Sequence, residues 1–153
     1  MPASVLPKPP ISSLYETDFY EWALRTAALL REGRFAELDL ENTAEEIEAL
    51  ARSDYNQLRN RTAILIAHLL KKGSQPAKAT RSWERTIAQQ RVRIETVLDA
   101  SPSLRRTLPE IAKRAWEPGA KLAMADTGLQ RDAFPAACPF TLEEIYGADL
   151  LAL

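Results

Sequence analysis

Apolar side chains recur every three or four residues through two long consecutive segments of the chain, 43–72 and 80–100. This spacing places them along one stripe of a helix. The first segment ends at Gly73, a residue type that commonly terminates helices. The short connection contains Pro76, and a residue that precedes proline resists helical geometry. The pattern therefore predicts two antiparallel helices joined as a long hairpin.

Shorter helical patterns flank the hairpin on both sides. We expect one helix over about 17–32 and another over about 108–127 that is kinked at Pro118. T-x-x-E capping boxes at 107–110 and 141–144 predict the starts of the fourth helix and of a last short one. Few glycines and many Ala, Leu, Glu and Arg residues favour helix over strand. The predicted fold class is all-α: a helical bundle built around the long hairpin, with shorter flanking helices.

Polar residues mark the start of the first hairpin helix and favour a break within it. The helix begins at Asp39 or at Thr43, and Thr43 forms a T-x-x-E box with Glu46. A straight helix of this size would extend about 45 Å at 1.5 Å per residue. This length favours a kink or break near Ser53 and Asp54, where Asp54 could cap a new turn.

The chain divides into a proline-rich start and one folded region. Proline recurs within 1–13 and cannot donate a backbone hydrogen bond, so we expect an extended or disordered N-terminal arm there. The chain has 153 residues, of which 46% are apolar. This is enough for one core and too little for two, so 14–153 is predicted to be a single all-helical domain.

The formal net charge of −1 conceals an uneven distribution. Residues 1–50 carry 4 basic and 10 acidic groups, residues 51–114 carry 14 and 5, and residues 115–153 carry 2 and 6. A basic middle segment, 59–114, can attract nucleic acid or an acidic protein. Alternatively, the acidic ends fold back and neutralise it.

Hydropathy and cysteine usage predict a cytoplasmic protein without membrane contact. The longest apolar run, 63–70, is interrupted by His68 and is far shorter than the roughly 20 residues that span a bilayer. The first residues lack the basic start and apolar core of a secretion signal. The single Cys138 cannot form an internal disulfide, which fits a reducing cytoplasm.

Polar residues interrupt the apolar stripe of the hairpin at intervals of seven positions, at Asp54, Arg61 and His68. If the two helices pair about their connecting loop, His68 faces Trp83 and Arg61 faces Gln90. A buried polar group without a partner costs about 1–3 kcal/mol. Each of these residues must therefore be hydrogen-bonded, lie at the rim or serve a function.

His68 is the only histidine, which suggests a general base or a metal ligand. The structural alternative is an imidazole stacked on Trp83, with one ring nitrogen bonded to a nearby oxygen. A single histidine is too few for a typical zinc site, so we expect no metal and no cofactor. Only a carboxylate from the first helix could complete a catalytic site. The candidate polar seam therefore comprises Asp18, Glu21, Arg61, His68, Trp83 and Gln90.

Six motifs are specific as a group: Y-E-T-D-F-Y-E-W at 15–22, D-L-E-N-T-A-E-E-I-E-A-L at 39–50, H-L-L-K-K at 68–72, R-S-W-E-R-T-I-A-Q-Q-R at 81–91, S-P-S-L at 101–104 and C-P-F-T-L-E-E-I at 138–145. Together they resemble a bacterial family, the domain of unknown function numbered twenty-nine, from about residue 14 to the C-terminus. The resemblance implies an all-helical fold and identifies no catalytic residue. The chain departs from the family at Lys72, where an aromatic residue is usual, and at Pro118-Gly119, which interrupts a stretch expected to be continuous.

The sequence supports three hypotheses about function. The first is a small cytoplasmic helical protein that binds a protein partner or forms a homo-oligomer, because the chain has a long apolar hairpin and no recognisable site. The second is binding of nucleic acid or of an acidic partner through 59–114. The third is an enzyme or ligand site around His68.

Overall fold

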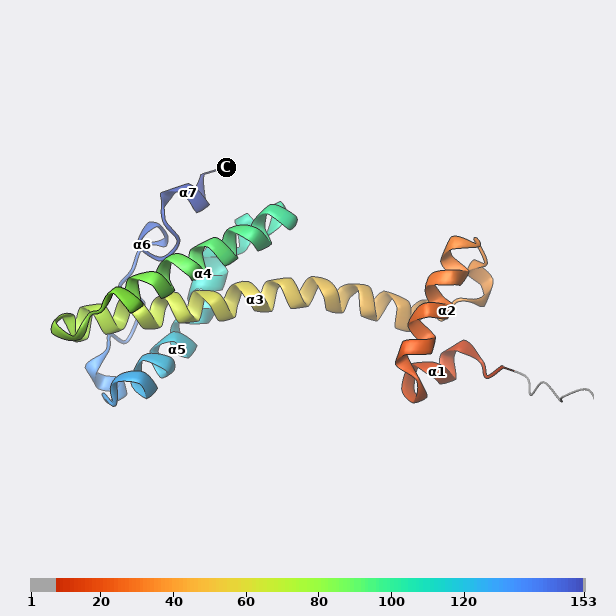
Figure 1. Ribbon diagram of the computed structural model, residues 1–153, viewed down its shortest axis with the longest axis horizontal. Coiled ribbons are helices and arrows are strands. Elements are labelled where there is room, and N and C mark those ends of the chain that lie inside the picture. Colours follow the sequence, from red (N-terminus) through yellow and green to blue (C-terminus); the bar gives the residue numbers. More distant parts are fainter. Residues whose placement is uncertain (1–7, 153) are drawn as a thin grey trace, which may run out of the picture. The chain divides into compact units, whose positions relative to one another are not determined.

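The protein is built from helices in the part that the computed structural model describes, residues 8–152 (Figure 1). These residues form seven α-helices and four short 3-10 helices, and they contain no strand. The predicted all-α fold class is therefore confirmed. The chain divides into two compact units, unit 1 over Met1–Arg52 and unit 2 over Ser53–Leu153. Helix α3 begins in unit 1 and ends in unit 2.

The α-helices are α1 (Ile11–Thr17), α2 (Phe19–Arg31), α3 (Leu40–Ser74), α4 (Arg81–Ala100), α5 (Leu108–Thr127), α6 (Leu142–Tyr146) and α7 (Ala148–Leu151). The 3-10 helices are η1 (Phe35–Glu37), η2 (Pro76–Lys78), η3 (Pro102–Thr107) and η4 (Arg131–Ala133). No helix among the described residues is long and apolar enough to cross a membrane.

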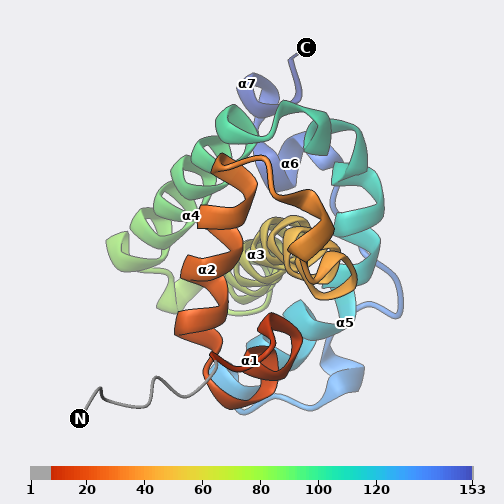
Figure 2. The ribbon, with the colours of Figure 1, turned by 90° about the vertical axis from the view of Figure 1, so that its right-hand side faces the viewer.

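Unit 1 consists of α1, α2, η1 and the first turns of α3. Helix α1 packs against the start of α2, and α2 crosses the first turns of α3 (Figure 2). The predicted arm over 1–13 lies mostly outside the described residues, and its last part is helical because α1 begins at Ile11. The chain contains two compact units. That they belong to a single domain over 14–153 stays a prediction.

Helix α3 is continuous over 35 residues, with no break at Ser53 or Asp54. It begins after Asp39, whose carboxylate accepts a hydrogen bond from the backbone N–H of Asn42 at 3.3 Å. The capping box predicted at Thr43 is wrong, because the Thr43 hydroxyl donates to the Asp39 carbonyl four residues back. Asp54 does not start a new turn. Its carboxylate instead accepts a hydrogen bond from the Ser101 hydroxyl at 3.1 Å.

In unit 2, the second half of α3 and helix α4 form the predicted antiparallel hairpin (Figure 1). Helix α5 continues through Pro118, as one helix rather than two, and ends at Gly128 in the left-handed conformation with φ of 73°. Gly119 lies against α3, and a β-carbon there would be 2.7 Å from Ile66 Cγ2. This glycine therefore permits the close approach of α5 to α3.

Two arginines hold the C-terminal helices against the rest of unit 2. Arg91 donates to the carbonyls of Glu144 and Ile145, and Arg105 donates to the carbonyl of Leu150. Both arginines thus satisfy carbonyls at or near helix C-termini, which lack intrahelical partners. The capping box at Thr141 that begins α6 is confirmed. The box at 107–110 is wrong, because the hydroxyl at 107 donates to the carbonyl of residue 104.

The core of unit 2 contains twenty buried apolar residues contributed by all of its α-helices and by the segment that follows η4. Leu58, Leu65 and Ile66 come from α3, Ile94 and Leu98 from α4. All five are fully buried. The hairpin is therefore a layer of a closed core rather than an isolated feature.

Candidate functional site

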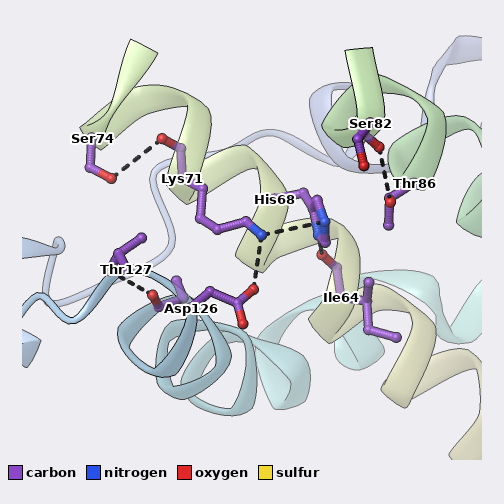
Figure 3. Close-up of polar contacts among 9 residues, drawn as sticks. Ile64, His68, Lys71, Ser74, Ser82, Thr86, Asp126 and Thr127 are labelled. Atoms are coloured by element: carbon purple, nitrogen blue, oxygen red, sulfur yellow. Dashed lines mark hydrogen bonds and ion pairs between the residues drawn. The ribbon is translucent and has the colours of Figure 1, made fainter. Parts of the chain in front are cut away.

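A polar cluster of unit 2 that includes the predicted His68 is centred on Lys71 (Figure 3). Its ammonium lies 2.8 Å from the Asp126 carboxylate and 3.5 Å from His68 Nε2. The same ammonium lies 5.0 Å from the centre of the Trp83 ring. Only 8% of the Lys71 side chain is exposed. The ammonium has therefore lost most of its hydration, and the contacts with Asp126, His68 and Trp83 compensate that loss.

The position of His68 fixes the role of each of its ring nitrogens. Nδ1 lies 2.9 Å from the carbonyl oxygen of Ile64, which can only accept, so Nδ1 carries the proton. Nε2 is then the acceptor that faces Lys71. Burial lowers the pKa of His68, and the Lys71 ammonium lowers it further, against the opposing effects of the Ile64 carbonyl and Asp126. The imidazole is therefore neutral at neutral pH.

The arrangement differs from the predicted one in two contacts. Trp83 lies under the ammonium of Lys71, which is one helical turn beyond His68, the residue expected to face Trp83. A carboxylate near the imidazole within unit 2 is that of Asp126 of α5, which the predicted seam did not include. The sequence contained a signal for Asp126, because it falls on the apolar stripe of α5 as the stripe's only charged member near the C-terminus.

The predicted contact between Arg61 and Gln90 is present. Arg61 Nη1 lies 3.4 Å from the Gln90 side-chain oxygen, and Gln90 is 8% exposed. The Nε of Arg61 is buried and has no hydrogen-bond partner within the described chain. The Arg61 guanidinium is therefore half-buried and has one weak hydrogen-bond partner, Gln90, which lies 29 positions away in the sequence.

Asp18 and Glu21 belong to unit 1, where they have a local role. The Asp18 carboxylate caps α2 by accepting from the Glu21 backbone N–H at 3.0 Å. This cap explains why an acidic residue stands at each position, since negative charge is favourable at a helix N-terminus. Their participation in a site with His68 stays a prediction.

The Lys71 cluster has the properties of a packed ion pair more than those of a reaction centre. The Lys71 ammonium is already bound to the Asp126 carboxylate and packed on the Trp83 ring. Among the described residues, no group of three or more His, Cys, Asp and Glu side chains is placed to hold a metal ion. An enzyme or ligand site at His68 stays a prediction without a substrate-sized space assigned to it.

Several basic groups of segment 59–114 are engaged within unit 2. Four of them contact carboxylates: Lys71 with Asp126, Lys72 with Glu84, Arg105 with Asp99 and Arg114 with Glu110. Arg91 is held by two backbone carbonyls. Cations that are already paired contribute less to phosphate binding, because their existing contacts must be broken. Nucleic-acid binding through this segment stays a prediction.

A second candidate site lies in unit 1, where α2 and the first turns of α3 line an apolar groove of about 440 Å³. We call it the groove of unit 1. Its lining residues are Phe19, Trp22, Ala23, Thr26, Ala27, Leu30, Thr43, Glu46, Ile47 and Leu50. Nine of these ten are uncharged.

The groove combines a recessed base with a highly exposed rim. Trp22 and Thr26 are only 3% and 5% exposed, whereas Ile47 and Leu50 are 62% and 71% exposed. The indole Nε1 of Trp22 and the hydroxyl of Thr26 are buried without a hydrogen-bond partner in the described chain. The one charged lining residue, Glu46, accepts a hydrogen bond from the Tyr15 hydroxyl at 2.6 Å. This bond raises the pKa of Tyr15 to about 12.

The amino-acid sequence contains a signal for this groove in the lengths of the two predicted hairpin helices. The predicted helix over 43–72 is longer than its hairpin partner over 80–100, so the partner cannot cover its first turns. Apolar residues in those turns must then face something else. The apolar stripe predicted over 43–72 includes Ile47 and Leu50, and the structure leaves both exposed on unit 1.

A family described as "Domain of unknown function DUF29" matches residues 14–151. The chain belongs to this family. The match includes the residues of both units, so the groove of unit 1 and the Lys71 cluster are both parts of the DUF29 domain of this chain. No curated protein and no solved structure matches the chain. Membership in DUF29 confirms the resemblance and assigns no activity.

Proposed function

We propose that this DUF29 protein acts by binding protein through the groove of unit 1. The observation that supports it is the exposure of apolar side chains there. Eight large apolar residues of unit 1 are at least 43% exposed: Phe19, Tyr20, Leu24, Leu30, Phe35, Leu40, Ile47 and Leu50. Scattered exposed apolar residues are ordinary, but four of these line one groove.

The groove offers enough apolar surface to support an interaction. Its four large exposed lining residues are 43% to 71% exposed. At roughly 200 Å² for a large side chain, they leave on the order of 450 Å² of apolar surface in water. Burying that area is worth about 11 kcal/mol at about 25 cal/mol per Å², which is comparable to the entropic cost of association. A partner also buries apolar surface of its own against the groove, and this burial adds to the favourable term.

The polar residues among the groove's lining suit a protein surface better than a purely apolar ligand. Trp22 Nε1 and the Thr26 hydroxyl each lack a hydrogen-bond partner within the described chain. Both atoms are buried below the surface of the groove, whereas Thr43 and Glu46 are polar residues that line it. Protein interfaces commonly combine an apolar centre with a few such polar contacts. We place this interaction in the cytoplasm, in keeping with the single cysteine.

The test is photo-crosslinking in the cells that naturally produce the protein. A benzophenone amino acid replaces Ile47 in the groove or, as the matched control, Val92 of unit 2, which is 60% exposed against 62% for Ile47. We expect protein crosslinks from position 47 and few from position 92. Equal crosslinking from the two positions would contradict the proposal.

A further inference from the structure

We propose that the occupant of the groove of unit 1 is the groove of a second copy, so that two chains form a twofold-symmetric dimer. This inference rests on the proposed function and specifies the partner. Twofold dimers are by far the commonest homo-oligomers, and they require a surface that is complementary to itself. Three properties of the groove meet that requirement.

The first property is the near absence of charge. In a twofold contact each residue faces residues of the same surface, so a lining rich in one sign of charge would repel itself. Glu46 is the single charged lining residue, and it is engaged by Tyr15. Two other acidic residues of these turns, Glu45 and Glu48, are bridged by Arg52 and do not line the groove.

The second property is that the groove contains both projecting and recessed parts. Ile47 and Leu50 are the most exposed of its lining residues, at 62% and 71%. Ala23 and Ala27 of α2 line it with small side chains, beside the buried Trp22. When the two copies face each other, the aliphatic side chains of one α3 can enter the space above the alanines of the other. Such interdigitation is how helix surfaces pack.

The third property is size. The four large lining side chains leave on the order of 450 Å² of exposed apolar surface per copy, taking roughly 200 Å² for each when fully exposed. A standard stable interface buries about 800 Å² per partner, of which somewhat more than half is apolar. The apolar surface of the groove therefore matches the apolar share of such an interface.

The test measures the mass of the full chain in solution. Sedimentation equilibrium over a micromolar concentration range is expected to give twice the chain mass of 17.1 kDa for the wild type. Leu50→Asp and Ile47→Asp should each weaken dimerisation by about 100-fold, as expected for a central apolar residue. Val92→Asp, which changes an equally exposed residue of unit 2, should leave it unchanged. Circular dichroism checks that all variants keep their helices.

Two further measurements locate the contact and identify its physical basis. Amide hydrogen exchange of the wild type should show protection of 19–30 and 43–50 that is lost on dilution, while unit 2 is unaffected. An apolar contact should also change little with added salt, because screening acts on charges. A wild type that is monomeric throughout, or a dimer that Leu50→Asp and Val92→Asp affect equally, would overturn the inference.

The crosslinking from position 47 separates this inference from the proposed function. Crosslinks that join two copies, recognised by a product of twice the chain mass, support both. Crosslinks to a different protein, together with a monomeric wild type, would overturn the dimer and leave the docking function standing. A monomer without crosslinks above those of position 92 would overturn both.

Discussion

The two units of this chain bury their apolar residues to very different extents. Unit 2 places twenty apolar residues in one core and, among its described residues, leaves only Val92 and Leu122 as large exposed ones. Unit 1 buries Leu14 and Trp22 and leaves eight large ones exposed among its described residues. Since burial of apolar surface is the main term that stabilises a fold, unit 2 supplies its own stability. Unit 1 has the composition of a folded unit but lacks part of the surface that would cover it.

Small residues show the same difference in detail. In α5 of unit 2, Ala115, Gly119 and Ala123 are buried where helices approach closely. In α2 of unit 1, Ala23 and Ala27 occupy comparable positions along an apolar stripe, but they line an open groove. A stripe of small residues is useful only where another surface can come near. The comparison therefore indicates that α2 is shaped for a contact that unit 1 alone does not make.

The largest predicted effect compares two leucines of the same helix. Leu65→Ala removes a fully buried side chain from the core of unit 2 and should lower the free energy of unfolding by about 3–4 kcal/mol. Leu50→Ala removes a side chain that is 71% exposed and should cost less than about 0.5 kcal/mol in the monomer. Urea unfolding at concentrations below dimerisation measures both. Similar losses would show that unit 1 is packed as tightly as unit 2.

A glycine pair sharpens the packing argument within unit 2. A β-carbon at Gly119 would lie 2.7 Å from Ile66 Cγ2 and 3.0 Å from the Ala63 carbonyl oxygen. Gly119→Ala should therefore destabilise the protein by about 1–3 kcal/mol through overpacking. Gly73, also helical, has no atom within 4 Å of the same position. Gly73→Ala should stabilise by up to about 1 kcal/mol, because alanine is the better helix former. Thermal unfolding of the two variants in opposite directions is the expected result.

Two adjacent lysines of α3 provide a smaller contrast. Lys71 is 8% exposed and bound to Asp126, whereas Lys72 is 38% exposed and bound to Glu84. Lys71→Ala should cost about 1–2 kcal/mol, a value reduced because Asp126 is half exposed and can be solvated when its partner is removed. Lys72→Ala should cost at most about 0.5 kcal/mol. Chemical denaturation measures both losses of unfolding free energy. Equal losses would show that the Lys71 cluster contributes no more to stability than an exposed ion pair does.

Much of the fold could be predicted because it depends on local patterns. The helix expected over 108–127 has those ends in the structure, and the one over 80–100 begins a single residue later. The contact of Arg61 with Gln90 followed from the antiparallel pairing of two regular helices. Periodicity and terminating residues act within a few positions, so one sequence contains them completely.

The predictions that were wrong or missing concern hydrogen-bond and packing partners. The local sequence pattern allows several partners and does not show which one is used. The Thr43 and Thr107 hydroxyls each donate to a backbone carbonyl three or four residues earlier. Each threonine nevertheless belongs to a sequence that matches a capping box. Asp126 reaches Lys71 only because α5 packs on α3 through Gly119. The lengths of the two predicted helices show that the hairpin partner cannot cover Ile47 and Leu50, but not that α2 lies beside them and forms a groove. Each of these depends on tertiary placement.

The smallest predicted effect is a pH dependence confined to unit 2. Burial lowers the pKa of His68 below its ordinary 6.5, so the unfolded chain binds a proton before the folded one does. Above pH 6.5 the imidazole is neutral in both states and this stability is fully present. As the pH falls from there towards the folded-state pKa, the stability is progressively lost. The difference in unfolding free energy between wild type and His68→Gln should therefore change with acidification.

The signal can be assigned to one unit because the three tryptophans are divided between them. Trp83 and Trp116 report on unit 2, and Trp22 reports on unit 1, so a Trp22→Phe background isolates the fluorescence of unit 2. In that background, acid should lower the unfolding midpoint less in His68→Gln than in the parent, because glutamine does not titrate. An identical pH dependence of the two proteins would show that His68 is as free to protonate when folded as when unfolded. The neutral imidazole would then no longer distinguish the closed packing of unit 2 from the open surface of unit 1.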